Sequence, residues 1–184
     1  MATKLFKKNG YGQIEPTHLS AQKTGQIFST KVNDTVSVLE NGAFLKLDGT
    51  TSGAGDFLLV FNEIKNYRSD EIGYKDFAIR KNQQLNDEIY TRLLKVNDDD
   101  YFVTNMIKFD NITGDATHAT VTSPTTKYFE VKTDSTTGYG VLEEVALASL
   151  TDGAPYYQIM EATTLPDGQE AYKVRRVGVT VKSS

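Results

Sequence analysis

The stretch TVSVLENGAFLKLDG (Thr35–Gly49) indicates most directly what kind of fold this chain adopts. Apolar residues stand on both sides of Asn41-Gly42, with Val38 before the pair and Phe44 after it. An Asn-Gly pair accepts positive φ at both central positions, so it favours a tight type I′ turn between antiparallel strands. We therefore expect a β-hairpin here, in a chain built from short antiparallel strands.

Short apolar runs separated by turn residues continue through the rest of the chain. Asn97–Asp100 predicts a second hairpin turn, and Pro166–Gly168 predicts the turn of a closing hairpin. Residues 81–96 and 141–150 fit a helix or a strand, although a strand from about Glu88 to Val96 is favoured. Further strands are expected in DFLLVFNEI (56–64), YKDFAIR (74–80), YFVTNMIKF (101–109), KYFEVK (127–132), PYYQIMEA (155–162) and EAYKVRRVGVTV (170–181). About nine strands with frequent turn signals predict a mainly β fold, an antiparallel β-sandwich or barrel.

The first 31 residues show neither the alternation of a strand nor the apolar stripe of a helix. Such a segment buries too little apolar surface to become ordered by itself. We therefore expect an extended N-terminal arm over residues 1–31 and a β-rich globular domain over residues 32–184. The arm would bind a neighbouring protein, and deleting residues 2–28 would abolish that attachment and leave the domain folded. The expected partner-binding residues are Lys4, Leu5, Phe6, Lys7, Lys8, Tyr11, Ile14, Leu19, Lys23, Ile27 and Phe28.

Charge is distributed unevenly along the chain. Residues 1–31 carry five Lys and one Glu, and residues 173–184 carry four basic residues and no acidic one. Since the whole chain carries −4 and these two ends together carry +8, residues 32–172 carry −12. Basic ends on an acidic body indicate contact with an acidic partner, either an identical neighbour or nucleic acid. Simple solvation of both ends is the alternative.

The strongest resemblance to an enzyme motif lies in the N-terminal segment. Ser20–Lys23 matches Ser-x-x-Lys and Lys23–Gly25 matches Lys-Thr-Gly, two motifs of serine β-lactamases. Those enzymes use two lysines on separate elements, and Lys23 would have to be both, so we interpret the match as coincidence. His18 and His118 could serve as bases, but no serine lies in a Gly-x-Ser-x-Gly elbow. We expect no catalytic residues, and a protein that is not an enzyme.

Metal and cofactor motifs are also missing from the sequence. The chain has two His and no Cys, so a zinc site would need several carboxylates brought together by the fold. Asn97–Asp100 could offer oxygen ligands to calcium, but it lacks the spacing, central Gly and distal Glu of an EF-hand loop. No phosphate-binding glycine motif is present. We expect neither a metal nor a cofactor.

Nucleic acid and membranes are disfavoured as partners. Lysines surround Phe6 and Tyr11 in the N-terminal segment, and basic and aromatic residues together can contact phosphates and bases. The acidic body would weaken that binding by repulsion. No stretch approaches the ~20 apolar residues that cross a bilayer.

A carbohydrate-binding β-sandwich is a further alternative. Exposed tyrosines can stack on sugar rings, and Tyr139, Tyr156 and Tyr157 are the candidates. The absence of Trp and the strand alternation, which turns these tyrosines inward, make this a minor alternative.

Lys4–Gln26 (KLFKKNGYGQIEPTHLSAQKTGQ), followed by Val36–Gly49 and by Thr- and Gly-rich strands with PDG and TDG turns, resembles small virion structural proteins of tailed bacteriophages. Head decoration or cement proteins are the most similar. The resemblance implies a non-enzymatic protein that binds the major capsid protein or other virion subunits and stabilises the head lattice. It also implies a homo-oligomer or a lattice-bound protein, located in virions that assemble in the host cytoplasm. A tail or neck protein would have the same composition.

Overall fold

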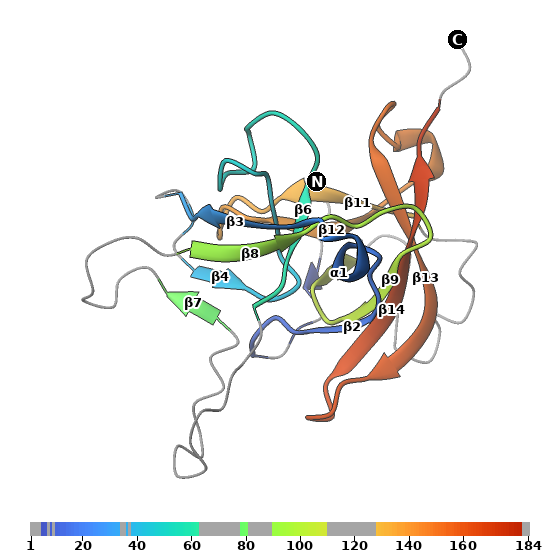
Figure 1. Cartoon of the computed structure of the whole chain (residues 1–184). Coiled ribbons are helices and arrows are strands. Elements are labelled where there is room, and N and C mark those ends of the chain that lie inside the picture. Colours follow the sequence, from blue (N-terminus) through green and yellow to red (C-terminus); the bar gives the residue numbers. More distant parts are fainter. Residues whose placement is uncertain are drawn as a thin grey trace.

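The computed structural model shows a mainly β protein whose sheet wraps around a central core (Figure 1). It describes residues 5–6, 8, 10–33, 36, 38–62, 78–80, 90–109 and 128–181, with only the backbone described at 5–6 and 78–80. In these ranges no helix is long and apolar enough to span a membrane. The mainly β, antiparallel sandwich-like fold expected from the sequence is confirmed.

Most of the strands are short. They are β1 (Leu5–Phe6), β2 (Ile14–His18), β3 (Ile27–Lys31), β4 (Val38–Glu40), β5 (Phe44–Leu45), β6 (Leu58–Val60), β7 (Ala78–Arg80), β8 (Tyr90–Leu94), β9 (Tyr101–Thr104), β10 (Ile107–Phe109), β11 (Tyr128–Thr133), β12 (Gly140–Val145), β13 (Pro155–Thr164) and β14 (Glu170–Val179). Two short helices accompany them, α1 (Ala21–Thr24) and the 3-10 turn η2 (Leu147–Ser149).

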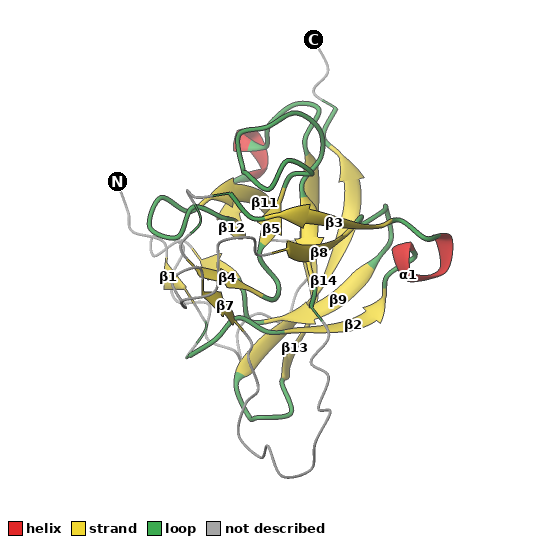
Figure 2. Cartoon of the chain, turned by 60° about the vertical axis from the view of Figure 1, so that its left-hand side comes forward, coloured by secondary structure: helices red, strands yellow, loops and turns green. Residues whose placement is uncertain are grey.

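One sheet contains almost all of these strands. Its order is β2-β9-β14-β13-β11-β12-β5-β6-β8-β3, and β10 joins β12 and β1 beside this path. All of its pairs are antiparallel except the parallel pair β10–β12. β4 and β7 form a separate two-stranded sheet. The two end strands, β2 and β3, are consecutive in the sequence and are joined through α1, which Figure 2 shows at one side of the molecule.

The central strands of this sheet are buried on both faces. Leu58 and Val60 of β6 pack into one apolar cluster, and Leu59 between them packs into the other. Leu93 and Leu94 of β8 are divided in the same way. Successive side chains of a strand point to opposite faces, so a strand buried on both faces is continuously apolar. This explains why these segments do not alternate between apolar and polar residues.

The closing hairpin is confirmed. β13 and β14 pair antiparallel from Pro155 opposite Val179 to Thr164 opposite Glu170. The turn between them closes with the Gly168 N–H donating to the Leu165 carbonyl at 2.8 Å, and Gly168 has the positive φ of +85° that the Pro-Asp-Gly sequence predicts. This hairpin is the longest regular element of the described chain and runs along one side of the body in Figure 1.

The predicted type I′ hairpin at Asn41-Gly42 is wrong, although a turn does form there. Only Gly42 has a positive φ, +87°, and the Ala43 N–H donates to the Glu40 carbonyl at 3.2 Å. A positive φ at the second central residue alone is the signature of a type II turn. The flanking strands do not pair with each other, because β4 pairs with β7, and β5 pairs with β6 and β12.

The turn at Asn97–Asp100 is present, but the hairpin expected around it is also wrong. β8 before the turn pairs with β3 and β6, whereas β9 after it pairs with β2 and β14. The turn therefore carries the chain from one end of the sheet to the other.

The two segments left open by the sequence are resolved in part. Residues 90–94 form strand β8, as favoured, while residues 81–89 lie outside the described part. Residues 140–145 form strand β12, and the 3-10 turn η2 follows it. Of the predicted strand at 74–80, only 78–80 is described, as β7.

The expected separate arm is corrected by the fold. Residues 14–18 pair with β9 and residues 27–31 pair with β8, so both segments are strands of the main sheet. Leu19 and Ala21 between them are 3% and 0% exposed and belong to the main core cluster. The scattered apolar residues of the segment find their core in the rest of the chain, which local sequence patterns do not reveal. Residue 31 is therefore not a boundary between an arm and a domain.

Candidate functional site

Several of the residues predicted to bind a partner are buried in the structure or lie where their side chains are not described. Ile14 and Ile27 are half-buried against the core, and Leu19 is fully inside it, so these three stabilise the chain's own fold. Leu5 and Phe6 form β1, which pairs with β10, and their side chains are not described. Lys4 and Lys7 lie outside the described residues.

Exposed members of the predicted set remain available to a partner. Tyr11 is 45% exposed and Phe28 is 37% exposed, and Lys23 is exposed on α1. Lys8 is mostly buried and forms an ion pair with Glu40. Of the predicted set, the structure therefore presents two aromatic side chains and one exposed basic side chain to solvent.

Glu40 fastens the beginning of the segment to the body. Its carboxylate is 5% exposed and accepts hydrogen bonds from the Lys8 ammonium, the Tyr139 hydroxyl and the Gly12 N–H, the last at 3.1 Å. Burial, followed by the neighbouring Glu40 carboxylate, raises the pKa of Tyr139 well above its ordinary value, so its hydroxyl stays a donor. Gly12 has no room for a side chain here, because a Cβ would lie 2.3 Å from the Met106 sulfur.

Asn105 and Thr104 hold the next residues of the segment. The Asn105 side chain accepts from the Gln13 N–H at 2.8 Å and donates to the Tyr11 carbonyl at 3.0 Å. The Thr104 hydroxyl donates to the Gln13 carbonyl at 2.8 Å. Both of these residues are 0% exposed, so the segment is held by buried polar side chains whose hydrogen-bonding groups find partners in it.

Asp100 holds the corner before α1. Its carboxylate accepts from the Ser20 N–H and hydroxyl, each at 2.9 Å, and from the Asn97 N–H at 2.8 Å. Asp100 is 2% exposed. Charge-assisted bonds of this kind are the strong ones in a protein interior. The Ser20 hydroxyl therefore has a structural role, and the acidic turn at Asn97–Asp100 supplies its acceptor.

An aromatic and basic group lies on the outer face of β2, β9 and β14. The ring of His18 on β2 stacks on the ring of Tyr101 on β9, with the two centroids 5.3 Å apart. The ammonium of Lys173 on β14 lies 4.9 Å from the centroid of the Tyr101 ring. His118, the other histidine considered for catalysis, lies outside the described residues. In the described part of the chain, no three His, Asp or Glu side chains are grouped closely enough to hold a metal ion.

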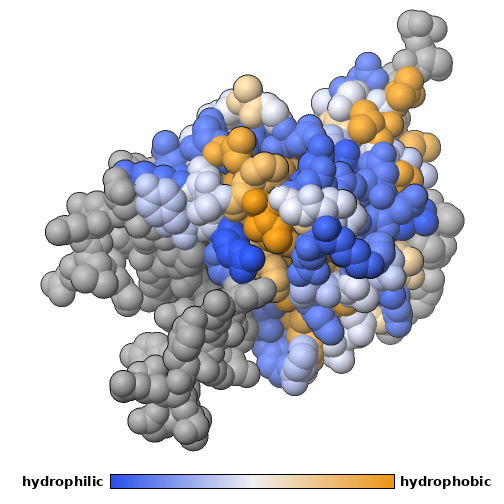
Figure 3. All heavy atoms as spheres, in the orientation of Figure 1, coloured by the Kyte–Doolittle hydropathy of each residue, from blue (hydrophilic) through white to orange (hydrophobic). Residues whose placement is uncertain are grey.

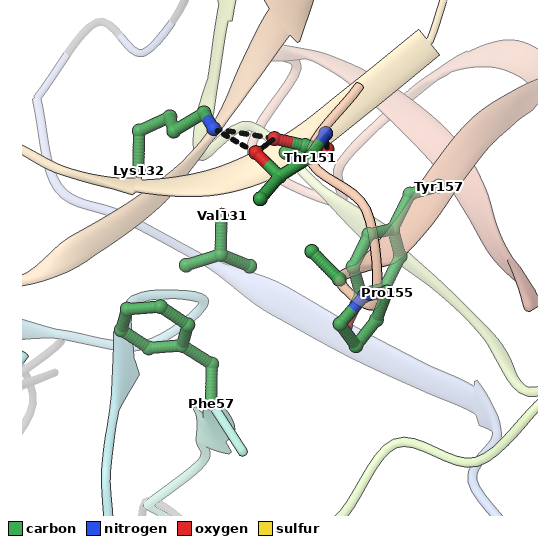
Figure 4. Close-up of a pocket in the computed structure, with 8 residues that line it drawn as sticks. Phe57, Val131, Lys132, Thr151, Pro155 and Tyr157 are labelled. Carbon is green, nitrogen blue, oxygen red and sulfur yellow. Dashed lines mark hydrogen bonds and ion pairs between the residues drawn. The ribbon is translucent and has the colours of Figure 1, made fainter. Parts of the chain in front are cut away.

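A small apolar pocket of about 200 Å³ lies where β6, β11 and the start of β13 meet (Figure 4). Figure 4 shows Phe57, Val131, Pro155 and Tyr157 around it, with Lys132 and Thr151 at one side. A space of this size holds one apolar side chain or one aromatic ring, since an apolar cavity of about 150 Å³ accepts benzene. Glu130 and Ala154 complete its lining.

Glu130 is the buried charge beside this pocket. It is 1% exposed, and its carboxylate accepts hydrogen bonds from the Lys132 ammonium and from the N–H and hydroxyl of Thr151, the last at 2.9 Å. Burial alone would raise the pKa of Glu130, but these hydrogen bonds outweigh it and hold the pKa below its ordinary value. The carboxylate is thus ionised and fully engaged, which suits a structural role rather than acid catalysis.

Asp134 has a similar environment beside a more open hollow. It accepts from the Lys108 ammonium and from the N–H and hydroxyl of Thr137, which outweigh the effect of burial and lower its pKa. The hollow of about 530 Å³ is lined mainly by hydroxyl-bearing residues, including Thr50, Ser52 and Thr133. Its polar lining and open shape offer no anchor for an apolar ligand.

The tyrosines considered for sugar binding are mostly inside the protein. Tyr139 and Tyr157 are 0% and 1% exposed, so neither can present a ring to a sugar. Tyr156 is half-buried, with its ring 6.0 Å from that of Tyr128. The carbohydrate-binding alternative therefore loses two of its three candidate residues.

Comparison with known proteins identifies no relative of this chain. No family model, no curated protein and no solved structure matches it.

Sequence reasoning missed the buried residues that hold the N-terminal segment. Glu40, Asp100 and Asn105 each stand in or next to a turn, where polar residues are ordinary, and their acceptors and donors come from far along the chain. Only Asp100 carried a local signal, since it ends the acidic run at Asn97–Asp100.

Proposed function

We propose that this protein is a non-enzymatic virion structural protein of the capsid-decoration type. It binds the head lattice of a tailed bacteriophage through the exposed side of its N-terminal segment and stabilises that lattice. The proposal rests on the resemblance of the sequence to such proteins and on one structural observation. That observation is the exposure of Tyr11, Lys23 and Phe28 on a segment whose strands β2 and β3 are paired into the main sheet.

The packing of the segment supports a binding role for these three side chains. A flexible arm loses conformational entropy when it docks, whereas a segment already held by Glu40, Asn105 and Asp100 does not. Aromatic residues contribute strongly to protein interfaces. Two aromatic side chains and one lysine on preordered backbone can thus bind a subunit with little further ordering.

The partner would be the major capsid protein or another virion subunit, and the protein would reside in virions assembled in the host cytoplasm. The net charge of +4 on residues 1–31 favours an acidic surface on that subunit. In this proposal the protein needs no cofactor, and nucleic acid and membranes are not its partners.

The test is co-sedimentation of the purified chain with tailed-phage heads produced from the genome that encodes it. The combined variant Tyr11→Ser, Lys23→Glu, Phe28→Ser changes only exposed side chains and is expected to fold normally and to lose attachment. The control is Leu147→Ser with Met160→Ser, which removes exposed apolar side chains elsewhere and should bind like the unchanged chain. Attachment of the triple variant at full occupancy, or failure of the unchanged chain to attach, contradicts the proposal. If antibodies against the protein label tails instead of heads, the partner is a tail or neck protein and not the head lattice.

A further inference from the structure

The end of β14 has an open edge. β9 covers this strand only from Tyr172 to Arg175, and the last backbone bonds on that side join Arg176 to the turn at Asp99 and Asp100, at 2.9 and 3.0 Å. From residue 177 to residue 181, the described chain places no backbone partner on that side. Figure 1 shows this end of β14 running past the rest of the sheet.

The backbone direction at this end is fixed by Thr180. Its N–H donates to the Ala154 carbonyl at 3.0 Å and its carbonyl accepts from the Gly153 N–H at 2.9 Å, both on the β13 side. Backbone groups of successive strand residues point to opposite edges. Val179 and Val181 therefore direct their N–H groups away from β13, towards the open edge.

The side chains of this segment make the edge suitable for pairing. Val179 is 44% exposed and Val181 is 87% exposed, and Figure 3 shows hydrophobic atoms at the upper right, next to the grey tip of the chain. Natural proteins protect open edges with charged residues, proline or β-bulges. In the segment VGVTV (Val177–Val181) the register with β13 shifts at Val177, which marks a bulge, but the segment has no charged residue and no proline. Val179, Thr180 and Val181 beyond the bulge are β-branched, and β-branched residues favour strand pairing.

We propose that this open edge pairs with the same edge of a second copy of the chain, antiparallel, across a two-fold axis near Thr180. In this arrangement Val179 of each copy exchanges backbone hydrogen bonds with Val181 of the other. A two-fold interface uses one surface patch twice, so a patch that is strand-forming along its length is self-complementary. The valine side chains of the two copies meet on one face of the joined sheet.

The charges at the two ends of the edge are complementary in this arrangement. The edge begins beside Asp98 and Asp99, which pair with Arg176 and Arg175 of the same chain and still leave 58% and 81% of their side chains exposed. In the sequence, Lys182 follows Val181. Antiparallel pairing brings the lysine of one copy towards the acidic turn of the other, whereas a parallel arrangement would place like charges together.

This self-association goes beyond the proposed virion function and uses different residues. The residues proposed to bind the lattice are Tyr11, Lys23 and Phe28, and none of them lies on β14. A chain that forms the dimer and does not bind phage heads would disprove only the virion proposal. A chain that binds heads as a monomer would disprove only the dimer.

The test is sedimentation equilibrium of the purified full chain over a range of concentrations. Val181→Pro removes the N–H that would donate to the second copy and leaves the Thr180 bonds in place. Val179→Lys adds the edge charge that natural proteins use. Val181→Thr keeps the N–H and the β-branch, and Leu47→Lys changes a 53% exposed apolar residue away from β14, so both serve as controls.

The unchanged chain and both controls should form a concentration-dependent dimer, and Val181→Pro and Val179→Lys should weaken it by roughly tenfold or more. Amide hydrogen exchange should show protection at Val179 and Val181 that increases with protein concentration. Two results overturn the proposal: a monomer at every concentration up to about 1 mM, or a dimer that both edge variants leave unchanged. Thermal unfolding of each variant shows that it is folded, and Val179→Lys carries the test if Val181→Pro is not.

Discussion

The carboxylate of Asp100 binds residues that are 77 positions apart in the sequence, since it accepts the N–H and hydroxyl of Ser20 as well as the N–H of Asn97. A buried carboxylate that loses its donors is costly, and so are donors that lose their carboxylate. One residue thus fixes the corner between β2 and α1.

Replacement of Asp100 by alanine is expected to lower the free energy of unfolding by about 3 kcal/mol, because hydrogen bonds to a charged group contribute about 1.5–3 kcal/mol each and are not additive. Ser20→Ala removes one donor, the hydroxyl, and should cost only about 1 kcal/mol. Urea denaturation of the three proteins measures both effects. A change of less than about 0.5 kcal/mol in Asp100→Ala, the size of an ordinary surface substitution, would show that the corner does not depend on this carboxylate.

Glu130 and Asp134 make the stability depend on pH in the acid range. Both have a folded-state pKa below the ordinary value, so the unfolded chain takes up their protons first as the pH falls. The stability that they contribute is fully present above the unfolded pKa, about 4, and is lost as the pH falls towards the folded pKa. The slope is at most about 1.4 kcal/mol per pH unit for each group.

Glu130→Gln should therefore be less stable than the unchanged chain at pH 7, and the difference between the two should shrink between about pH 5 and pH 3. Chemical denaturation at several pH values measures this. A difference that stays constant over that range would mean that Glu130 has the same pKa in the folded and unfolded chain. Glu161→Gln on β13, at an exposed position, serves as the control for the loss of one negative charge.

At the scale of elements, the closing hairpin was predictable because its information is local. Pro166–Gly168 specifies the turn, and the strands on either side pair directly with each other. Asn41-Gly42 has an equally strong turn sequence, yet its strands pair elsewhere. The difference is that Leu39 and Phe44 are buried in different clusters, so tertiary packing decides their neighbours.

The N-terminal segment could not be predicted because its stabilising contacts are almost all distant. Ile14 packs on the core and pairs with Thr104, and Leu19 is buried among residues from several strands. A sequence window that contains only the segment holds none of these partners. Three of the residues that the sequence suggested for binding, Tyr11, Lys23 and Phe28, do lie on the surface.

At the scale of the molecule, the segment completes the sheet at both of its ends. β2 covers the outer edge of β9 and β3 covers the outer edge of β8, while α1 joins them. An uncovered edge strand exposes unpaired backbone groups and favours aggregation. One continuous segment of the chain therefore protects two edges and contributes Leu19 and Ala21 to the core between them.

Deletion of residues 2–28 is therefore expected to unfold the protein rather than to release an intact domain. The deletion removes β1, β2, α1 and the start of β3, and with them the buried Leu19 and Ala21. Loss of one buried leucine costs about 2–5 kcal/mol, and a domain has only about 5–15 kcal/mol in total. The truncated chain should lose its cooperative thermal transition and expose the edges of β8 and β9, which calorimetry and light scattering measure.

Deletion of residues 2–4 alone, before the first described strand, is the control and should retain the transition. A truncated chain that unfolds cooperatively within a few degrees of the full chain would restore the interpretation of residues 1–31 as a separate docking arm.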